Sequence, residues 1–341
     1  MSGSAIGILL VLFGGLFAGN CMLPLKRIRT WPWECTWLVF SLVSLVLLPW
    51  LVAAFSIPDW PHLYFSLPLA AWLPSLLLGF GWGIAQVLFG IAVVRLGMSL
   101  AFTLIVGLGT VFGTLIPLVA LHRAELYSSS SATLIAGCGL MVVGVALSGI
   151  AGKLRERPAV ADDAVKGGTR GADSAYLIGL GIAVLSGVLS SMLNLSLAFG
   201  GPISRAAVYS GAEASMAAFA VWPVALGGGL IANLGYAVWL LSKNRTWKLL
   251  ATGWQDAFFS MLMGLLWFGA VAIYGISTRY LGRLGDSAGW AIYEITIVLA
   301  ANVAGLMMGE WRRASRLAVG VLASGVFVLI VATVTTAFST R

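Results

Sequence analysis

Charged residues are scarce in this chain. Asp, Glu, Lys and Arg make up only 9% of its 341 residues, whereas 60% are hydrophobic and the mean hydropathy is +0.99. Soluble domains carry about a quarter of their residues as charges, so the composition excludes a water-soluble globular protein. The apolar runs are continuous and about 20 residues long, which predicts transmembrane helices and argues against the short alternating strands of a β-barrel.

Residues for catalysis, metal binding and disulfides are also few. The two histidines, His62 and His122, fall in predicted loops, and neither a metal-ligand cluster nor a phosphate-binding glycine loop is present. We therefore predict no enzyme, cofactor or metal. Cys21, Cys35 and Cys138 are odd in number and lie in or beside apolar runs, which excludes a disulfide framework.

The apolar runs predict ten spans, at residues 4–25, 35–56, 71–94, 97–121, 132–152, 174–198, 211–241, 257–277, 286–309 and 317–338. The seventh is long and contains Pro223 and Gly227 to Gly229, which predicts a tilted, kinked or partly unwound helix. One sizeable polar connection, residues 153–173, divides the chain into five-helix units at residues 1–152 and 174–341.

The distribution of basic residues predicts the orientation in the membrane. Of the 20 Lys and Arg residues, 15 fall in odd-numbered connections and 5 in even-numbered connections or at the termini. The positive-inside rule then places the odd connections in the cytoplasm and both termini on the outer side. Because the basic residues are scattered through short loops, the net charge of +8 does not indicate a nucleic-acid partner.

The two units resemble each other at a constant offset of 185 residues, which pairs Leu78-Gly79 with Met263-Gly264, Trp82 with Trp267, Phe89-Gly90 with Tyr274-Gly275, and Leu96-Gly97 with Leu281-Gly282. Since each unit has an odd number of spans, corresponding helices run in opposite directions. Inverted repeats are typical of transporters that bind a solute where the halves meet, near the middle of the membrane.

Glu294 is the one ionisable residue in the interior of a predicted span. A carboxylate at that depth costs about 3 kcal/mol or more, and such residues usually face the interior of a bundle or a water-filled path. On a helix it shares a face with Trp290, Ser287 and Asn302. We predict a solute site with a titratable carboxylate; the alternative is a structural carboxylate hydrogen-bonded to a neighbouring helix.

Aromatic and amide side chains are the candidate substrate contacts. Sugars stack on aromatic rings and bond to amides, and the helical spacing suggests that Trp82, Phe89 and Gln86 on one span match Trp267 and Tyr274 on another. Ordinary core packing is the alternative. Further candidates are Asn20 and Asn194, at roughly corresponding places in the two units, and the neighbours of Glu294, Trp290 and Tyr293. For both asparagines, hydrogen bonding between helices is the alternative.

Several segments resemble the L-rhamnose–proton symporter family of the drug/metabolite transporter superfamily. They are Lys26 to Glu34 (KRIRTWPWE), Leu73-Pro74 with Gly79 and Trp82-Gly83-Ile84, Arg95 to Ser99 (RLGMS), Gly227 to Gly229 with Asn233 to Gly235, and Gly309 to Trp311. The resemblance covers essentially the whole chain. It implies a ten-helix fold of two inverted halves and proton-driven uptake of a deoxy sugar such as L-rhamnose across the bacterial inner membrane.

The resemblance leaves the role of the ninth span open, because Tyr293 and Glu294 lie outside the matching segments. Either the carboxylate is an added coupling group or this branch carries a different solute. The leading hypothesis is a symporter working by alternating access, with Glu294 binding the proton and with sugar, protons and lipid as partners. The alternatives are an exporter or facilitator of another metabolite, and a membrane sensor that transports nothing.

Overall fold

The computed structural model describes residues 3–96, 98–160, 169–282, 285–309, 311–312 and 314–340. Over these residues the secondary structure is entirely helical, and ten helical segments are long and apolar enough to cross a membrane. The prediction of an all-α, multi-pass membrane protein with ten spans is therefore confirmed. The principal helices are α1 (Gly3–Asn20), α2 (Trp33–Leu42), α3 (Leu48–Ser56), α5 (Leu69–Leu96), α6 (Met98–Leu121), α7 (Ser129–Val160), α8 (Thr169–Ser190), α11 (Trp222–Asn244), α12 (Trp254–Tyr280), α13 (Gly285–Met307) and α14 (Arg316–Phe338).

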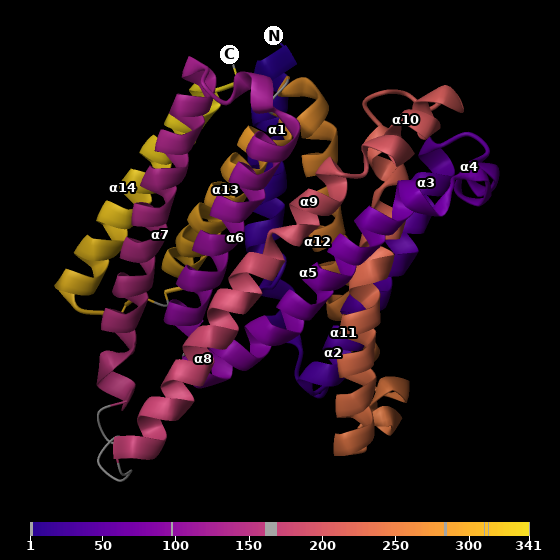
Figure 1. Cartoon of the computed structure of the whole chain (residues 1–341). Coiled ribbons are helices and arrows are strands. Elements are labelled where there is room, and N and C mark those ends of the chain that lie inside the picture. Colours follow the sequence, from indigo (N-terminus) through magenta and orange to yellow (C-terminus); the bar gives the residue numbers. More distant parts are fainter. Residues whose placement is uncertain are drawn as a thin grey trace.

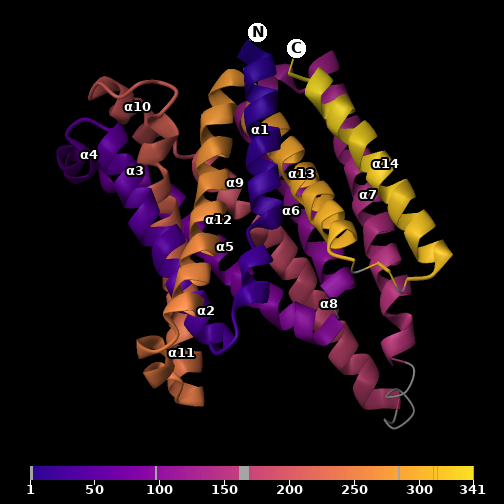
Figure 2. The ribbon, with the colours of Figure 1, turned by 180° about the vertical axis from the view of Figure 1, so that it is seen from behind.

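Both termini lie at the same side of the bundle, which we call the terminal side (Figure 1). The opposite side, where α7 ends and α8 begins, is called the linker side; residues 161–168 of the predicted connection lie outside the described residues. Helices α7 and α14 pack against each other at one flank, and α5 packs along α11 (Figures 1 and 2). Helices α1, α6, α12 and α13 fill the space between, and α13 packs on both α1 and α6.

The predicted irregularity of the seventh span lies at its start and not at its glycines. Residues 211–221 form turns and the 3-10 helix Ala217–Ala220, whereas α11 begins at Trp222 and continues without a break through Gly227 to Gly229. Pro223 lies in the first turn of α11, where a helix needs no hydrogen bond from the backbone nitrogen. The sixth span is also irregular, because α8 ends at Ser190 and is followed by the short helices α9 (Met192–Ala198) and α10 (Gly201–Tyr209).

Glycines in α5 and α11 allow the two helices to touch along their backbones. A Cβ atom added at Gly79 would overlap the carbonyl oxygen of Ala225, and one at Gly228 would overlap that of Leu76. Small residues at such contacts let membrane helices approach closely, because lipid supplies no hydrophobic force to drive them together. The glycine run that suggested unwinding is therefore a packing surface.

Two carboxylates, Asp256 in the first turn of α12 and Glu34 in the first turn of α2, join the start of α2 and the chain before it to the end of α11 and the start of α12. Asp256 accepts hydrogen bonds from the backbone nitrogens of Arg29, Thr30 and Trp31, at 3.1, 2.8 and 3.0 Å, and from the Thr30 hydroxyl. Glu34 Oε1 accepts from Asn244 Nδ2 and Thr246 Oγ1, each at 2.9 Å. Within the KRIRTWPWE segment, the side chains of Thr30 and Glu34 therefore have a structural role in joining these helices.

We expect Asp256→Asn to lower the stability of the protein by about 1–3 kcal/mol, because the backbone donors lose a charged acceptor. The measurement is thermal unfolding in detergent, followed by tryptophan fluorescence. Asp59→Asn is the matched control, since Asp59 is exposed and Asn tolerates its left-handed backbone (φ 46°). Equal melting temperatures for the two variants would contradict the role given to Asp256.

We also expect Gly79→Ala to destabilise the protein by about 1–3 kcal/mol, since the added methyl group must push α11 away from α5. Gly90→Ala, on the same helix, serves as the control because a Cβ atom there meets nothing within 4 Å. The same unfolding assay compares them. Because alanine favours the helix over glycine, Gly90→Ala should leave the stability unchanged or raise it. If it proved as destabilising as Gly79→Ala, close approach of α11 would not be the cause.

Candidate functional site

Three aromatic residues form a cluster between α12 and α13. The ring centroid of Tyr274 lies 5.6 Å from that of Trp290 and 5.1 Å from that of Tyr293, and the last two are 5.8 Å apart. All three side chains are buried, and Trp290 Nε1 donates to the carbonyl oxygen of Gly109 on α6 at 3.3 Å. The structure thus brings together three of the predicted substrate-binding residues.

Glu294 lies beside this cluster, directly after Tyr293 and one helical turn after Trp290 on α13. It lies deep in the bundle but keeps part of its surface accessible, whereas Tyr293 and Ile295 on either side are buried. No described residue forms a hydrogen bond or an ion pair with its carboxylate. A carboxylate in this setting is available to a proton or a solute hydroxyl rather than committed to a structural partner.

Asn194 connects four helices at the first turn of α13. Its Nδ2 donates to the carbonyl oxygens of Gly113 on α6 and Asp286 on α13, each at 2.8 Å, and its Oδ1 accepts from the Tyr274 hydroxyl. The side chain is fully buried. It belongs to the short helix α9, so the break after Ser190 is what turns this amide toward the other three helices.

The remaining aromatic candidates separate into two places. Trp82 stacks on Trp267 with ring centroids 5.3 Å apart and an interplanar angle of 21°, so these rings meet where α5 approaches α12. Phe89 instead lies in an apolar cluster with Phe102 on α6, 6.5 Å away. Gln86, one turn after Trp82, is half-buried and makes no hydrogen bond to a described residue.

Asn20 lies apart from the other candidates. Its Nδ2 bonds back to the carbonyl oxygen of Leu16 at 2.8 Å, and it lines a small pocket of about 380 Å³ with residues of the last turns of α13, including Val303 and Met307. Asn194, in contrast, bonds to the first turn of α13. The two asparagines, paired on the basis of sequence, therefore do not meet in the structure.

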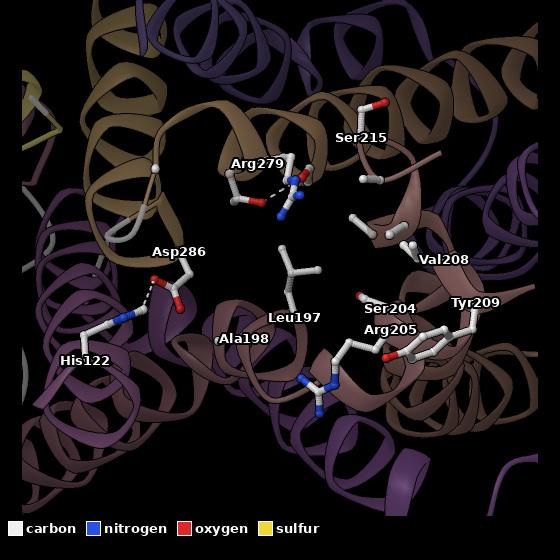
Figure 3. Close-up of a pocket in the computed structure, with 16 residues that line it drawn as sticks. His122, Leu197, Ala198, Ser204, Arg205, Val208, Tyr209, Ser215, Arg279 and Asp286 are labelled. Carbon is white, nitrogen blue, oxygen red and sulfur yellow. Dashed lines mark hydrogen bonds and ion pairs between the residues drawn. The ribbon is translucent and has the colours of Figure 1, made fainter. Parts of the chain in front are cut away.

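A pocket of about 540 Å³ opens at the terminal side between α9, α10, α12 and α13 (Figure 3). Arg279 on α12 and Arg205 on α10 lie on opposite walls, and Tyr209 lies beside Arg205. At one edge His122 Nε2 and Asp286 Oδ1 are 2.9 Å apart. This hydrogen bond and the charge of Asp286 raise the pKa of His122, although partial burial opposes the effect.

A second pocket, of about 370 Å³, opens at the linker side between α1, α6, α7 and α13. It is lined by Val298 and Asn302, one and two turns after Glu294, whereas Asp286 in the first pocket lies two turns before it. Asn302 also donates to Ser148 on α7 at 3.4 Å. Along α13, Glu294 therefore lies between two openings on opposite sides of the bundle.

Sequence reasoning missed Asp286, Arg205 and Arg279, and it considered His122 only as a candidate for catalysis. A signal was present in the predicted topology. His122 follows the fourth predicted span, and Asp286 begins the ninth, so both were expected on the same side of the membrane. Their contact nevertheless depends on how α6 packs against α13, which the spacing of residues does not reveal.

We expect Tyr274→Phe to destabilise the protein by about 1–3 kcal/mol, because it leaves the buried Oδ1 of Asn194 without its donor while keeping the ring in place. Thermal unfolding in detergent measures the change. Tyr280→Phe, on the same helix, is the matched control because the Tyr280 hydroxyl bonds to no described residue. A melting temperature unchanged by Tyr274→Phe would show that the bond to Asn194 contributes little.

Comparison with known proteins adds an independent observation. Residues 1–339 match the family described as L-rhamnose-proton symport protein (RhaT). The chain is 31% identical over 336 residues to a protein of Cronobacter sakazakii named L-rhamnose-proton symporter, and the alignment covers 96% of this chain and 95% of that protein. Proteins of the same name from Escherichia coli and Shigella flexneri are 29% identical over the same shares of each chain.

Proposed function

Because the chain belongs to the L-rhamnose–proton symporter family, it is a membrane transporter and not an enzyme, and we propose that it carries L-rhamnose or a related deoxy sugar inward together with protons. The observation that carries the proposal is the position of Glu294, a carboxylate without a described partner that lies between two opposed pockets. Export of another metabolite on the same scaffold is the second candidate, but no feature of the structure favours it over import.

Alternating access assigns a role to each part of the site. Glu294 binds a proton from the terminal side and is then neutral, which removes the cost of a charge in the bundle while the sugar binds. The halves rock so that the opening passes from the terminal side to the linker side, where proton and sugar leave. The pockets on the two sides of Glu294 support this cycle.

The proposed sugar contacts are the nine residues predicted to bind the substrate. Tyr274, Trp290 and Tyr293 lie beside Glu294, and their rings suit the C–H faces of a sugar. Trp82, Trp267 and Gln86 flank the same interior from α5 and α12. The amide of Asn194 would supply hydrogen bonds when the terminal side opens. Phe89 and Asn20 remain in the proposed set, but their present contacts are elsewhere.

We further propose two inverted repeats, at residues 1–152 and 174–341, in a drug/metabolite transporter-like fold. The packing supports this: α1 packs on α12 and α13, while α8, its counterpart, packs on α5 and α6. Helix α1 starts at the terminal side and α8 at the linker side. Helices α7 and α14, which correspond to each other, are in mutual contact.

The proposed location is the bacterial inner membrane, with the terminal side facing the periplasm. The excess of Lys and Arg in the odd connections supports this orientation, because such residues are retained on the cytoplasmic side. Protons driven inward then reach the terminal pocket first, as a symporter requires.

We expect Glu294→Gln to abolish proton-driven accumulation of labelled L-rhamnose in proteoliposomes, because an amide cannot exchange a proton. Sugar exchange across the membrane at equal pH should persist, since Gln resembles the protonated carboxyl in shape and polarity. Uptake with and without an imposed inward proton gradient is the measurement.

Glu213→Gln is the matched control, since Glu213 is exposed at the terminal side and bonds to Ser215 at 2.6 Å. It should accumulate sugar as the unmodified protein does. Gradient-driven accumulation by Glu294→Gln would refute the coupling role. Efflux exceeding uptake in the unmodified protein, with no response to the gradient, would favour the exporter.

A further inference from the structure

We propose that His122 and Asp286 form a second proton-binding site, separate from Glu294, which holds the terminal side of the transporter closed when it is occupied. The pair joins the end of α6 to the first turn of α13 at the edge of the terminal pocket (Figure 3). This inference deepens the proposed symport and rests on it.

The hydrogen bond between His122 and Asp286 connects two helices, α6 and α13, and does not only cap the end of one of them. His122 Nε2 and Asp286 Oδ1 are 2.9 Å apart, and the side chains are only 20% and 19% exposed. Water from the terminal pocket reaches both groups, so protons can exchange there without passing through the packed interior. Partial burial also preserves more of their attraction than full exposure would.

Asp286 connects this bridge to the buried hydrogen bonds of Asn194. While its carboxylate faces His122, its backbone carbonyl oxygen accepts from Asn194 Nδ2 at 2.8 Å and lies 3.4 Å from the Tyr274 hydroxyl. One residue further, the Ser287 hydroxyl is buried and has no hydrogen-bond partner among the described residues. The first turn of α13 is therefore held at its outer edge by a titratable contact, above a polar interior that is incompletely satisfied.

The charges around His122 act in both directions. Asp286 on α13 and Glu125, just beyond the end of α6, favour the protonated imidazole. Arg279 on α12 and Arg205 on α10 line the pocket on its other walls, and Arg123 follows His122 directly in the chain. The helix α9 beneath the pocket carries no charged residue.

The net effect fixes the sign of the pH dependence. With the bridge formed, which we take as the closed form of the terminal side, the pKa of His122 lies above its usual value, chiefly through the hydrogen bond to Asp286. The closed form therefore gains stability that is fully present below the ordinary pKa of histidine and is lost as the pH rises through the raised pKa. Protons at the terminal side thus close it, and their loss favours opening.

A terminal side that closes when it binds protons fits a symporter. The terminal side then closes only when protons, the coupling ions, are present. A transporter that closes after Glu294 is loaded carries its proton inward, whereas closure while it is empty would move the sugar site without the ion. His122 and Asp286 exchange protons with the same solution that protonates Glu294, but their side chains are directly accessible to water.

The test measures how well the first turn of α13 is shielded at different pH values. Ser287→Cys places a thiol directly below the bridge, and the native cysteines are buried. The purified protein in detergent is treated with a small charged methanethiosulfonate. Ser210→Cys, exposed at the terminal side, corrects for the pH dependence of thiol reactivity. The same measurement is made with His122→Gln, which can keep the hydrogen bond but cannot acquire the charge.

With His122 present, the rate of labelling at position 287 relative to position 210 should fall by about three- to tenfold between pH 8 and pH 5, as expected for a partly exposed titrating pair. In His122→Gln the ratio should change by less than about twofold. An equal fall in both proteins, or no fall with His122 present, would overturn the proposal. Should His122→Gln not fold, Asp286→Asn supplies the same comparison and should also give a flat ratio.

This assay involves no sugar and no gradient, so its outcome is independent of the uptake experiments. A flat ratio in a protein that accumulates L-rhamnose would refute only the second proton site. A pH-dependent ratio in a protein that accumulates no sugar would leave the site standing and refute the proposed substrate.

Discussion

A carboxylate in the middle of a helical bundle has to be neutralised, paired or hydrated, since its charged form is expensive to hold away from water. Glu294 has no hydrogen-bond or charge partner among the described residues, and it retains accessible surface where its neighbours do not. The surrounding arrangement follows from that constraint. Aromatic rings exclude water on one side, and pockets approach along α13 from both directions. This setting supports the proposal that Glu294 acquires and releases a proton during transport.

Close packing between other helices compensates for the incomplete packing around Glu294. Glycines bring the backbones of α5 and α11 into direct contact, and a Cβ atom at Gly15 of α1 would overlap Thr296 of α13. Contacts of this kind recover dispersion energy between helices that lipid does not force together. The proposed alternating access requires helices to move against one another, and glycine places no side chain of its own in such a contact. The same residue type therefore stabilises the bundle and permits its rearrangement.

The sequence allowed the number of spans, the position of Glu294 and much of its aromatic surroundings to be predicted, because hydropathy and helical periodicity are local properties. Its failures were of another kind. Pro223 and the glycines after it were interpreted as a break, since a glycine required by a neighbouring helix looks the same in sequence as one that unwinds its own. The partners of Asn194 and His122 depend on tertiary packing between distant helices, and no spacing along the chain encodes them.

The two sides of the bundle are held together by different chemistry, and this difference bears on which side responds to protons. At the linker side, Asp256 binds three backbone nitrogens and Glu34 binds an amide and a hydroxyl, none of which titrates near neutral pH. At the terminal side, the contact between α6 and α13 includes a histidine. Since histidine is the side chain whose charge ordinarily changes near neutral pH, a proton gradient acts on the terminal contact and leaves the bonds of Asp256 and Glu34 intact. In the proposed cycle, the terminal side would move while these bonds keep α2 joined to α11 and α12, and proton arrival would thereby be coupled to a change of access.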